Sequence, residues 1–284
     1  MKCKISTLQL IKGKSRVDHY IKNFSNGWED IQSSLSRHHQ ITVLGWQDVA
    51  TRYRRSKVGA WWLTINMLVL ITTLGFVFGM LFRQPMAEYL PYLTAGFIFW
   101  GLISTVISEG CTSFIAAGET ILQIRMPLFT HIARTIWRNL IISCHNMLIL
   151  PLVFIVFMKP PSWTFLLIFP GLIILILNLA WVMVISAIIC TRFRDATQII
   201  QNFLQVAFYL TPVIWSPDLV PERAGTFILD MNPFYHLIQI VRAPILGDPI
   251  SINTWIIAVL MAIVGWLIAI PFLGIYRKRI AYWL

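Results

Sequence analysis

Long apolar runs separated by short polar connections dominate the chain from residue 58 onward. They fall at residues 58–82, 91–115, 139–158, 163–190, 198–215 and 252–276. Each run has about 18 residues or more, which is enough for a helix to cross a hydrocarbon core of about 30 Å. The pattern predicts an all-α polytopic membrane protein with six transmembrane helices, in which residues 58–284 form the membrane domain.

A seventh apolar stretch, residues 225–247, is long enough to span but is interrupted by Asp230, Asn232, Pro233, Arg242 and Pro244. With six spans, 19 of the 23 lysines and arginines fall on one side of the membrane. Basic residues favour the cytoplasmic side, so the count places both termini in the cytoplasm.

The segment 216–250 is therefore predicted to dip into the outer leaflet as two re-entrant half-helices. Pro217 and Pro221 open the first half-helix, whereas Asn232 caps the second and Pro233 occupies its first turn. Irregular backbone at that depth needs protein or water around it, which suggests a position over a pore mouth.

An amphipathic helix is predicted at residues 43–57, directly before the first span, after a cytosolic N-terminal segment of residues 1–42. Helical spacing separates an apolar side, with Val43, Trp46, Val49, Ala50 and Tyr53, from a polar side, with Asp48, Arg52 and Arg55. Such a helix lies in the membrane interface and offers its polar side to a cytosolic partner.

The composition agrees with a membrane protein, because 57% of the residues are apolar and only 12% are charged. The net charge of +11 comes from short clusters beside apolar runs, which argues against nucleic-acid binding. The four cysteines are far apart and the histidines lack ligand spacing, so we expect no metal site and no catalytic residue in this chain.

The fifth predicted span carries an unusual polar stripe. Its members lie within about 100° of one another on a helical wheel and are Gln198, Gln201, Asn202, Gln205 and Tyr209. Carboxamides are costly in hydrocarbon, so the stripe either holds helices together or lines a hydrated path. A path of this kind suits sugars, because amides donate and accept hydrogen bonds in many orientations.

Aromatic side chains near the outer half of the spans are further candidates for a glycan path, since rings give weak and sequence-tolerant stacking contacts. The candidates are Phe76, Phe97, Trp100, Phe208, Tyr209 and Trp215. The alternative is an interfacial belt or contacts between helices, as is common for aromatic residues at span ends.

Glu109 is an acidic residue inside the second predicted span, and a carboxylate there requires a partner. Arg138, at the start of the third span, lies at a similar depth. We therefore predict that Glu109 and Arg138 form a structural ion pair.

Four segments carry a family resemblance: WQDVATRYRRSKVGAWWLTIN (46–66), ETILQIRMPLFTHIAR (119–134), TRFRDATQIIQNFLQVAFYLTPVIW (191–215) and LDMNPFYHLIQIVR (229–242). Through them the chain resembles the type-2 ABC permeases of bacteria, the membrane subunits that export O-antigen, capsule and teichoic acid. The resemblance implies a homodimeric pore driven by two copies of a separate ABC ATPase, which would bind the ATP and Mg²⁺. The GKS sequence at 13–15 is not a phosphate-binding loop, because Leu8 stands where such a loop needs its first glycine. This agrees with an ATPase on a separate chain.

The same resemblance implies that the loop after the second span docks into the ATPase. Here this is residues 119–129, which we call the coupling segment. The ATPase contacts expected from it and from the amphipathic helix are Glu119, Gln123, Arg125, Met126, Pro127, Asp48, Arg52 and Arg55.

The resemblance implies the inner-membrane subunit of an ATP-driven exporter of a lipid-linked polysaccharide, with membrane lipid around it. A type-2 ABC exporter of a drug or small lipid is the alternative. An intramembrane transferase acting on lipid-linked sugar is a weaker one, because it needs His and Asp residues that converge at one depth.

Overall fold

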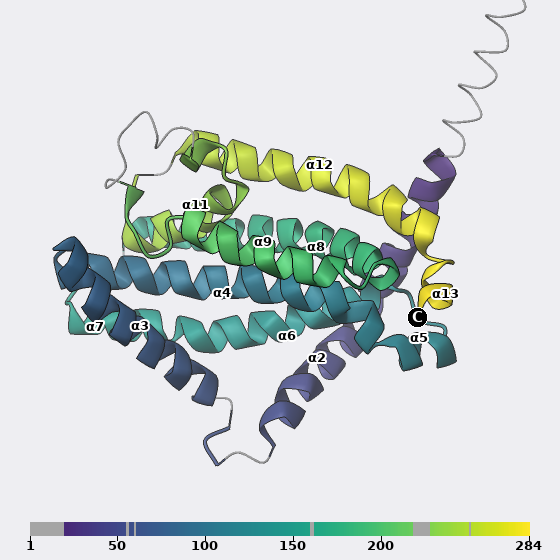
Figure 1. Ribbon diagram of the computed structural model, residues 1–284, viewed down its shortest axis with the longest axis horizontal. Helices are drawn as coiled ribbons and strands as arrows, with labels where there is room; N and C mark the ends of the chain where they lie inside the picture. Colours follow the sequence, from purple (N-terminus) through teal and green to yellow (C-terminus); the bar gives the residue numbers. More distant parts are fainter. Residues whose placement is uncertain (1–19, 55–56, 60, 160–161, 218–227, 250) are drawn as a thin grey trace, which may run out of the picture.

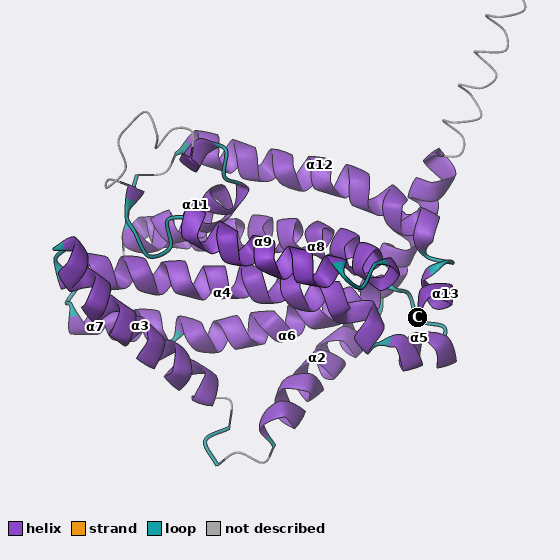
Figure 2. Ribbon diagram, in the orientation of Figure 1, coloured by secondary structure: helices purple, strands orange, loops and turns teal. Residues whose placement is uncertain are grey.

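The computed structural model describes residues 20–54, 57–59, 61–159, 162–217, 228–249 and 251–284. These residues form helices joined by turns, with no strand among them (Figures 1 and 2). The predicted all-α class is confirmed.

Residues 20–35 are helical and precede the labelled helices. The order is then α2 (His38–Tyr53), α3 (Trp61–Phe82), α4 (Met86–Ala116), α5 (Gly118–Gln123), α6 (Phe129–Met147), α7 (Ile149–Val156), the 3₁₀ helix η1 (Trp163–Leu167), α8 (Ile168–Arg192), α9 (Ala196–Leu210), α11 (Pro233–Leu246), α12 (Ile252–Tyr276) and α13 (Ile280–Trp283).

Five helical segments of the described chain are long and apolar enough to cross a membrane. They are α3, α4, the pair α6 and α7, the pair η1 and α8, and α12, and they correspond to five of the six predicted spans. The chain is thus a multi-pass membrane protein, and the count of six stays a prediction because of α9.

Helix α9 is shorter than the span predicted at 198–215. It has 15 residues, or about 22 Å of helix, and ends at Leu210. Thr211 has extended backbone angles, φ −90° and ψ 134°, because the ring of Pro212 disfavours the helical conformation for the preceding residue. The predicted fifth span therefore ends as a helix before these two residues.

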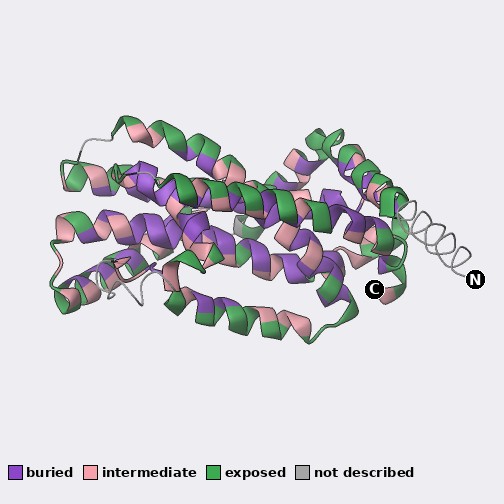
Figure 3. Ribbon diagram, turned by 90° about the horizontal axis from the view of Figure 1, so that it is seen from above, coloured by how far each residue is buried: buried purple, intermediate pink, exposed green. Residues whose placement is uncertain are grey.

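Helix α4 is the centre of the protomer and packs against α3, α6, α8, α9 and α11. In its most apolar stretch of 18 residues 72% of positions are buried, compared with 17% in α3. Figure 3 shows the same contrast between inner helices with many buried positions and outer helices that are largely exposed, and many of the exposed residues are apolar. The exposed faces must meet lipid or another protein chain.

The amphipathic helix differs from its prediction in its bounds. Helix α2 starts at His38, five residues before the predicted start, and packs against α6 through Ile41, Gly45 and Val49. Trp46, on the predicted apolar side, is exposed, as expected for a residue that faces the membrane interface. The close approach depends on Gly45, because a Cβ there would lie 2.7 Å from Trp137 Cδ1.

The predicted cap of the second half-helix is confirmed. Asn232 Oδ1 accepts hydrogen bonds from Phe234 N (3.0 Å) and Tyr235 N (3.4 Å), and Pro233 is the first residue of α11. Most of the first predicted half-helix, residues 218–227, lies outside the described residues. The re-entrant depth of both remains a prediction.

Different elements lie at the two ends of the bundle. Helices α5 and α13 lie at one end, and the turn between α3 and α4 lies at the other (Figure 1). Residues 20–35 also reach the first end, where their helix packs along α12. We call this the α5 end.

Candidate functional site

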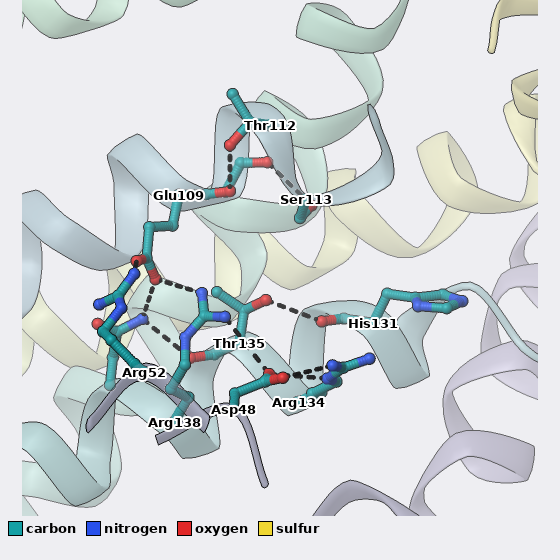
Figure 4. Close-up of polar contacts among 11 residues, drawn as sticks. Asp48, Arg52, Glu109, Thr112, Ser113, His131, Arg134, Thr135 and Arg138 are labelled. Carbon is teal, nitrogen blue, oxygen red and sulfur yellow. Dashed lines mark hydrogen bonds and ion pairs between the residues drawn. The ribbon is translucent and has the colours of Figure 1, made fainter. Parts of the chain in front are cut away.

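A cluster of charged side chains joins α2, α4 and α6 near the α5 end (Figure 4). Arg138 Nη2 donates to Glu109 Oε2 at 2.7 Å, so the structure brings together the two side chains that the sequence pairs. Asn139 Nδ2 donates to the same carboxylate oxygen. The Glu109 carboxylate is thereby fixed by two neighbours on α6.

Helix α2 supplies the second carboxylate of the cluster. Arg134 donates through Nε to Asp48 Oδ2 at 2.8 Å and through Nη2 to Asp48 Oδ1, which makes a bidentate pair. Arg138 Nη1 reaches Asp48 Oδ2 at 3.4 Å, and Arg52 Nη2 lies 3.9 Å from Glu109 Oε1.

The polar side of α2, predicted to face a cytosolic partner, also makes contacts within the chain, while the Arg52 side chain stays 52% exposed. Asp48 and Arg52 both engage side chains of their own chain, because packing of Gly45 and Val49 on α6 turns Asp48 toward Arg134 and Arg138. Arg55, the third residue of that predicted side, lies outside the described residues.

Arg138 is the residue that links the two halves of the cluster, since it contacts both Asp48 and Glu109. The three side chains are 18–23% exposed, so their charges are screened less than those of surface pairs. The cluster borders a cavity of about 340 Å³ that is lined in addition by Thr112, His131 and Thr135. A shift of α2 relative to α4 must therefore break or rearrange contacts with Arg138.

The sequence analysis missed a polar stripe on α6. Its buried members are His131, Thr135, Asn139, Ser143 and Asn146. Their spacing of three and four residues is a helical signal that could have revealed the stripe. Asn139, Ser143 and Asn146 line a second cavity of about 320 Å³, between α3, α4 and α6.

The coupling segment is largely exposed at the α5 end. Glu119, Gln123 and Arg125 are exposed together with apolar Leu122 and Ile124, whereas Met126 and Pro127 are half-buried. Leu122 and Ile124 are 60% and 54% exposed. Charged residues around two exposed apolar side chains make a surface typical of a protein contact.

Helix α9 presents three different faces. Leu204 and Ala207 are buried in the protomer, where α9 packs mainly on α4, and Ile199, Phe203, Val206 and Leu210 form an exposed apolar face. The predicted polar stripe forms the third face, and all five of its residues are exposed in the protomer. Within the stripe Gln198 Nε2 donates to Asn202 Oδ1 at 3.0 Å.

The aromatic candidates divide between the interior and the surface. Phe97 and Trp100 are 8% and 7% exposed, and each contacts the ring of Phe208, with centroids 5.7 Å and 5.6 Å apart. The prediction that these two rings face a path does not hold in the protomer, because they lie on the buried central helix α4. Phe76 and Tyr209 are exposed, and Trp215 is half-buried.

Residues 211–216, which follow α9, are held by buried groups that the sequence analysis did not select. Arg242 is 1% exposed, donates to the carbonyl of Pro212 at 2.6 Å and stacks over the ring of Tyr92 at 4.1 Å. The Tyr92 hydroxyl donates to the carbonyls of Pro212 and Trp215, and the Tyr89 hydroxyl to that of Ile214. These groups satisfy carbonyls that the early end of α9 leaves without helical partners.

The long apolar helices define a polytopic membrane protein. Residues 39–246, well over half of the chain, match the family model of the ABC-2 type transporter. The chain belongs to this family.

Its relatives point to one branch of the family. The chain is 25% identical over 244 residues to the O-antigen export system permease protein RfbA of Klebsiella pneumoniae, which covers 84% of this chain and 91% of that relative. It is 26% identical over 203 residues to the protein of the same name from Myxococcus xanthus, covering 69% and 76%. Both relatives carry the name of an O-antigen export permease.

Proposed function

We propose that two copies of this chain form the membrane part of an ATP-driven exporter that moves a lipid-linked polysaccharide out of the cytoplasm. Two copies of a separate ABC ATPase supply the driving force at the α5 end. The chain itself hydrolyses nothing, and both of its termini lie in the cytoplasm.

The observation that carries this proposal is the exposed amide face of α9. Three glutamines, an asparagine and a tyrosine are too polar to face hydrocarbon, and the protomer does not cover them. Two such faces from two copies enclose a hydrated corridor, in which amides and rings bond to sugar hydroxyls without selecting one sequence of sugars.

The neighbouring apolar face of α9 supports the same arrangement. Ile199, Phe203 and Val206 are 57–67% exposed, so this face needs lipid or a second protomer beside it. In the proposed dimer the amide face borders the corridor, and the apolar face next to it packs against lipid or the second copy and so seals the corridor from the bilayer. A single copy cannot enclose a path with this geometry.

A deletion strain tests the substrate class. We expect cells that lack the chain to retain glycan in the cytoplasm, visible by staining, and expect the wild-type chain to restore export. The double variant Gln201→Leu, Gln205→Leu should restore little export, whereas the control Val206→Leu, on the apolar face of α9, should restore it fully. Normal surface glycan in the deletion strain would instead favour the export of a drug or small lipid.

The coupling segment tests the role of the ATPase. The double variant Arg125→Glu, Met126→Asp should insert normally but separate ATP hydrolysis from export, because it reverses a charge and adds another on the proposed docking surface. Arg83→Glu, an exposed arginine at the opposite end of the bundle, is the matched control. Export at the wild-type rate in the double variant would contradict the assignment of this surface.

A further inference from the structure

Residues 20–35 form a helix that lies outside the family match of residues 39–246, as does α12. These two helices cross in direct backbone contact. A Cβ on Gly27 would overlap the carbonyl oxygen of Ile270, and a Cβ on Gly274 would overlap that of Asn23. Only glycine permits such an approach at both positions.

Hydrogen bonds fix this crossing along its length. The Tyr20 hydroxyl donates to the carbonyl of Leu267 at 3.0 Å, and Arg277 Nη1 donates to the carbonyl of Asn26 at 2.8 Å. Arg277 also lies 3.5 Å from Glu29, but the Glu29 side chain is 69% exposed, so this surface pair adds little to the anchoring. The helix of residues 20–35 is thus anchored to α12 on one side.

On its other side the same helix caps α6. Asp30 Oδ1 accepts a hydrogen bond from Phe129 N at 2.9 Å, and Asp30 Oδ2 accepts one from Leu128 N at 3.2 Å. Asp30 is 8% exposed, and one turn later the hydroxyl of Thr130 donates to that of Ser34 at 3.1 Å. The residues at the start of α6 cannot supply this cap themselves, because Leu128, at the N-cap position, has no side-chain acceptor.

The two residues capped by Asp30 lie between the coupling segment and the part of α6 that enters the charged cluster. Leu128 and Phe129 are the last two residues of the coupling segment. Helix α6 then carries Arg134 and Arg138 into the charged cluster with Asp48 and Glu109. A displacement of the coupling segment reaches that cluster through the first turns of α6.

We propose that Asp30 is a positioning residue for energy coupling: it ties the end of the coupling segment to the frame formed by residues 20–35 and α12. An ATPase that pushes on the segment then moves α6 as a rigid lever against that frame. Without the cap the first turn of α6 frays and absorbs the movement. This inference rests on the proposed function, since it needs an ATPase at the coupling segment.

A stabilising role alone does not account for Asp30 well. Burial raises the pKa of this carboxyl above its usual range, because desolvation outweighs the hydrogen bonds from Phe129 and Leu128. A serine or asparagine at the N-cap position would satisfy the same kind of backbone group without a buried charge. Because Asp30 lies on a distant helix, its cap also connects the helix of residues 20–35 to the start of α6, which a local cap would not do.

The test compares Asp30→Ala and Asp30→Asn with the control Glu29→Ala, which changes the adjacent exposed carboxylate. Each variant is purified with its ATPase and placed in proteoliposomes with lipid-linked glycan extracted from the deletion strain. Glycan exported per ATP hydrolysed is the main measurement. Hydrogen exchange at the amides of Leu128 and Phe129, in the chain without the ATPase, reports the cap directly.

We expect Asp30→Ala to lower export per ATP about fivefold, the factor that corresponds to loss of one capping interaction. Exchange at the two amides should accelerate, while ATPase binding and the KM for ATP stay unchanged. Asp30→Asn, which retains one acceptor oxygen, should give intermediate values, and Glu29→Ala should match wild type.

Faster exchange with unchanged export per ATP would overturn the proposal, as would an equal loss in Glu29→Ala. If Asp30→Ala does not fold, wild-type coupling in Asp30→Asn overturns it instead. If wild type itself exports nothing with the ATPase, the proposed function fails and the coupling role falls with it, although the exchange data still report the cap. If wild type and Asp30→Ala couple equally, only the role of Asp30 is lost.

Discussion

At the scale of single residues, Arg138 shows how a few charges can connect three helices. Its guanidinium donates to Glu109 of α4 and to Asp48 of α2, and its planar fork allows both contacts at once. The pairing with Glu109 followed from sequence, because both residues lie at one depth in adjacent spans. The contact with Asp48 did not, because the orientation of α2 depends on Gly45 packing against Trp137.

Glu109→Gln should destabilise the chain by about 1–3 kcal/mol, because it removes the charged acceptor of Arg138 and Asn139 while Arg138 remains half-buried. Thermal unfolding in detergent measures the change, with the exposed Glu119→Gln as control. The exchanged pair Glu109→Arg, Arg138→Glu should not restore stability, since the new glutamate would face Asp48. Full recovery in that double variant would contradict the three-residue cluster.

The buried carboxyl of Asp30 gives a pH dependence with a defined sign. Desolvation raises its pKa above 3.8, while the hydrogen bonds from Phe129 and Leu128 and the charge of Arg277 oppose the shift and the charge of Glu29 adds to it. The folded state then binds the proton more tightly than the unfolded state, so ionisation costs stability as pH rises from 3.8 through the folded pKa.

Asp30→Asn does not titrate and should gain stability relative to wild type as pH rises through this interval. The difference should then level off once Asp30 is ionised in both states. Unfolding temperatures of both proteins from about pH 4 to 8 measure it. A difference that shrinks with rising pH would mean that the hydrogen bonds outweigh the desolvation.

At the scale of elements, the sequence predicted where helices lie better than where they end or which way they face. Five predicted spans correspond to helices because apolar length alone determines them. Helix α9 ends early because of Pro212, which the sequence displays, but the groups that stabilise this end come from α4 and α11. Such contacts between distant segments have no local signal.

Arg242→Lys tests the contacts that hold residues 211–216. Lysine retains the charge but loses the stacking on Tyr92 and the two-nitrogen contact with Gln239. We expect a loss of about 1–3 kcal/mol in thermal unfolding, because polar groups buried around residue 242 lose their partner. Arg83→Lys, at an exposed position, should leave the unfolding temperature unchanged. Equal losses of stability in the two variants would contradict a specific role of Arg242.

At the scale of the whole molecule, some groups are satisfied within the described chain and others are left exposed. The cluster of Asp48, Glu109 and Arg138 and the capping contact of Asp30 lie within one chain, so their geometry is complete in the protomer. The amide face of α9 is exposed, and in the proposed dimer a second copy would complete the corridor beside it. Sequence predicts the stripe from residue types, but only the packing of α9 on α4 shows that it points away from the protomer.

Two adjacent residues of α9 allow a test of whether the amide face lines a hydrated corridor while the apolar face contacts lipid. Gln205 and Val206 are both exposed but lie about 100° apart around the helix, one on the amide face and one on the apolar face. In a chain whose four native cysteines are replaced, Gln205→Cys should react with a membrane-impermeant thiol reagent at least tenfold faster than Val206→Cys, since thiolates form in water and not in hydrocarbon. The assembled complex in membranes is the sample, and protection of Gln205→Cys by added glycan would place substrate beside it. Equal labelling of the two positions, or faster labelling of Val206→Cys, would mean that the amide face does not line a hydrated path.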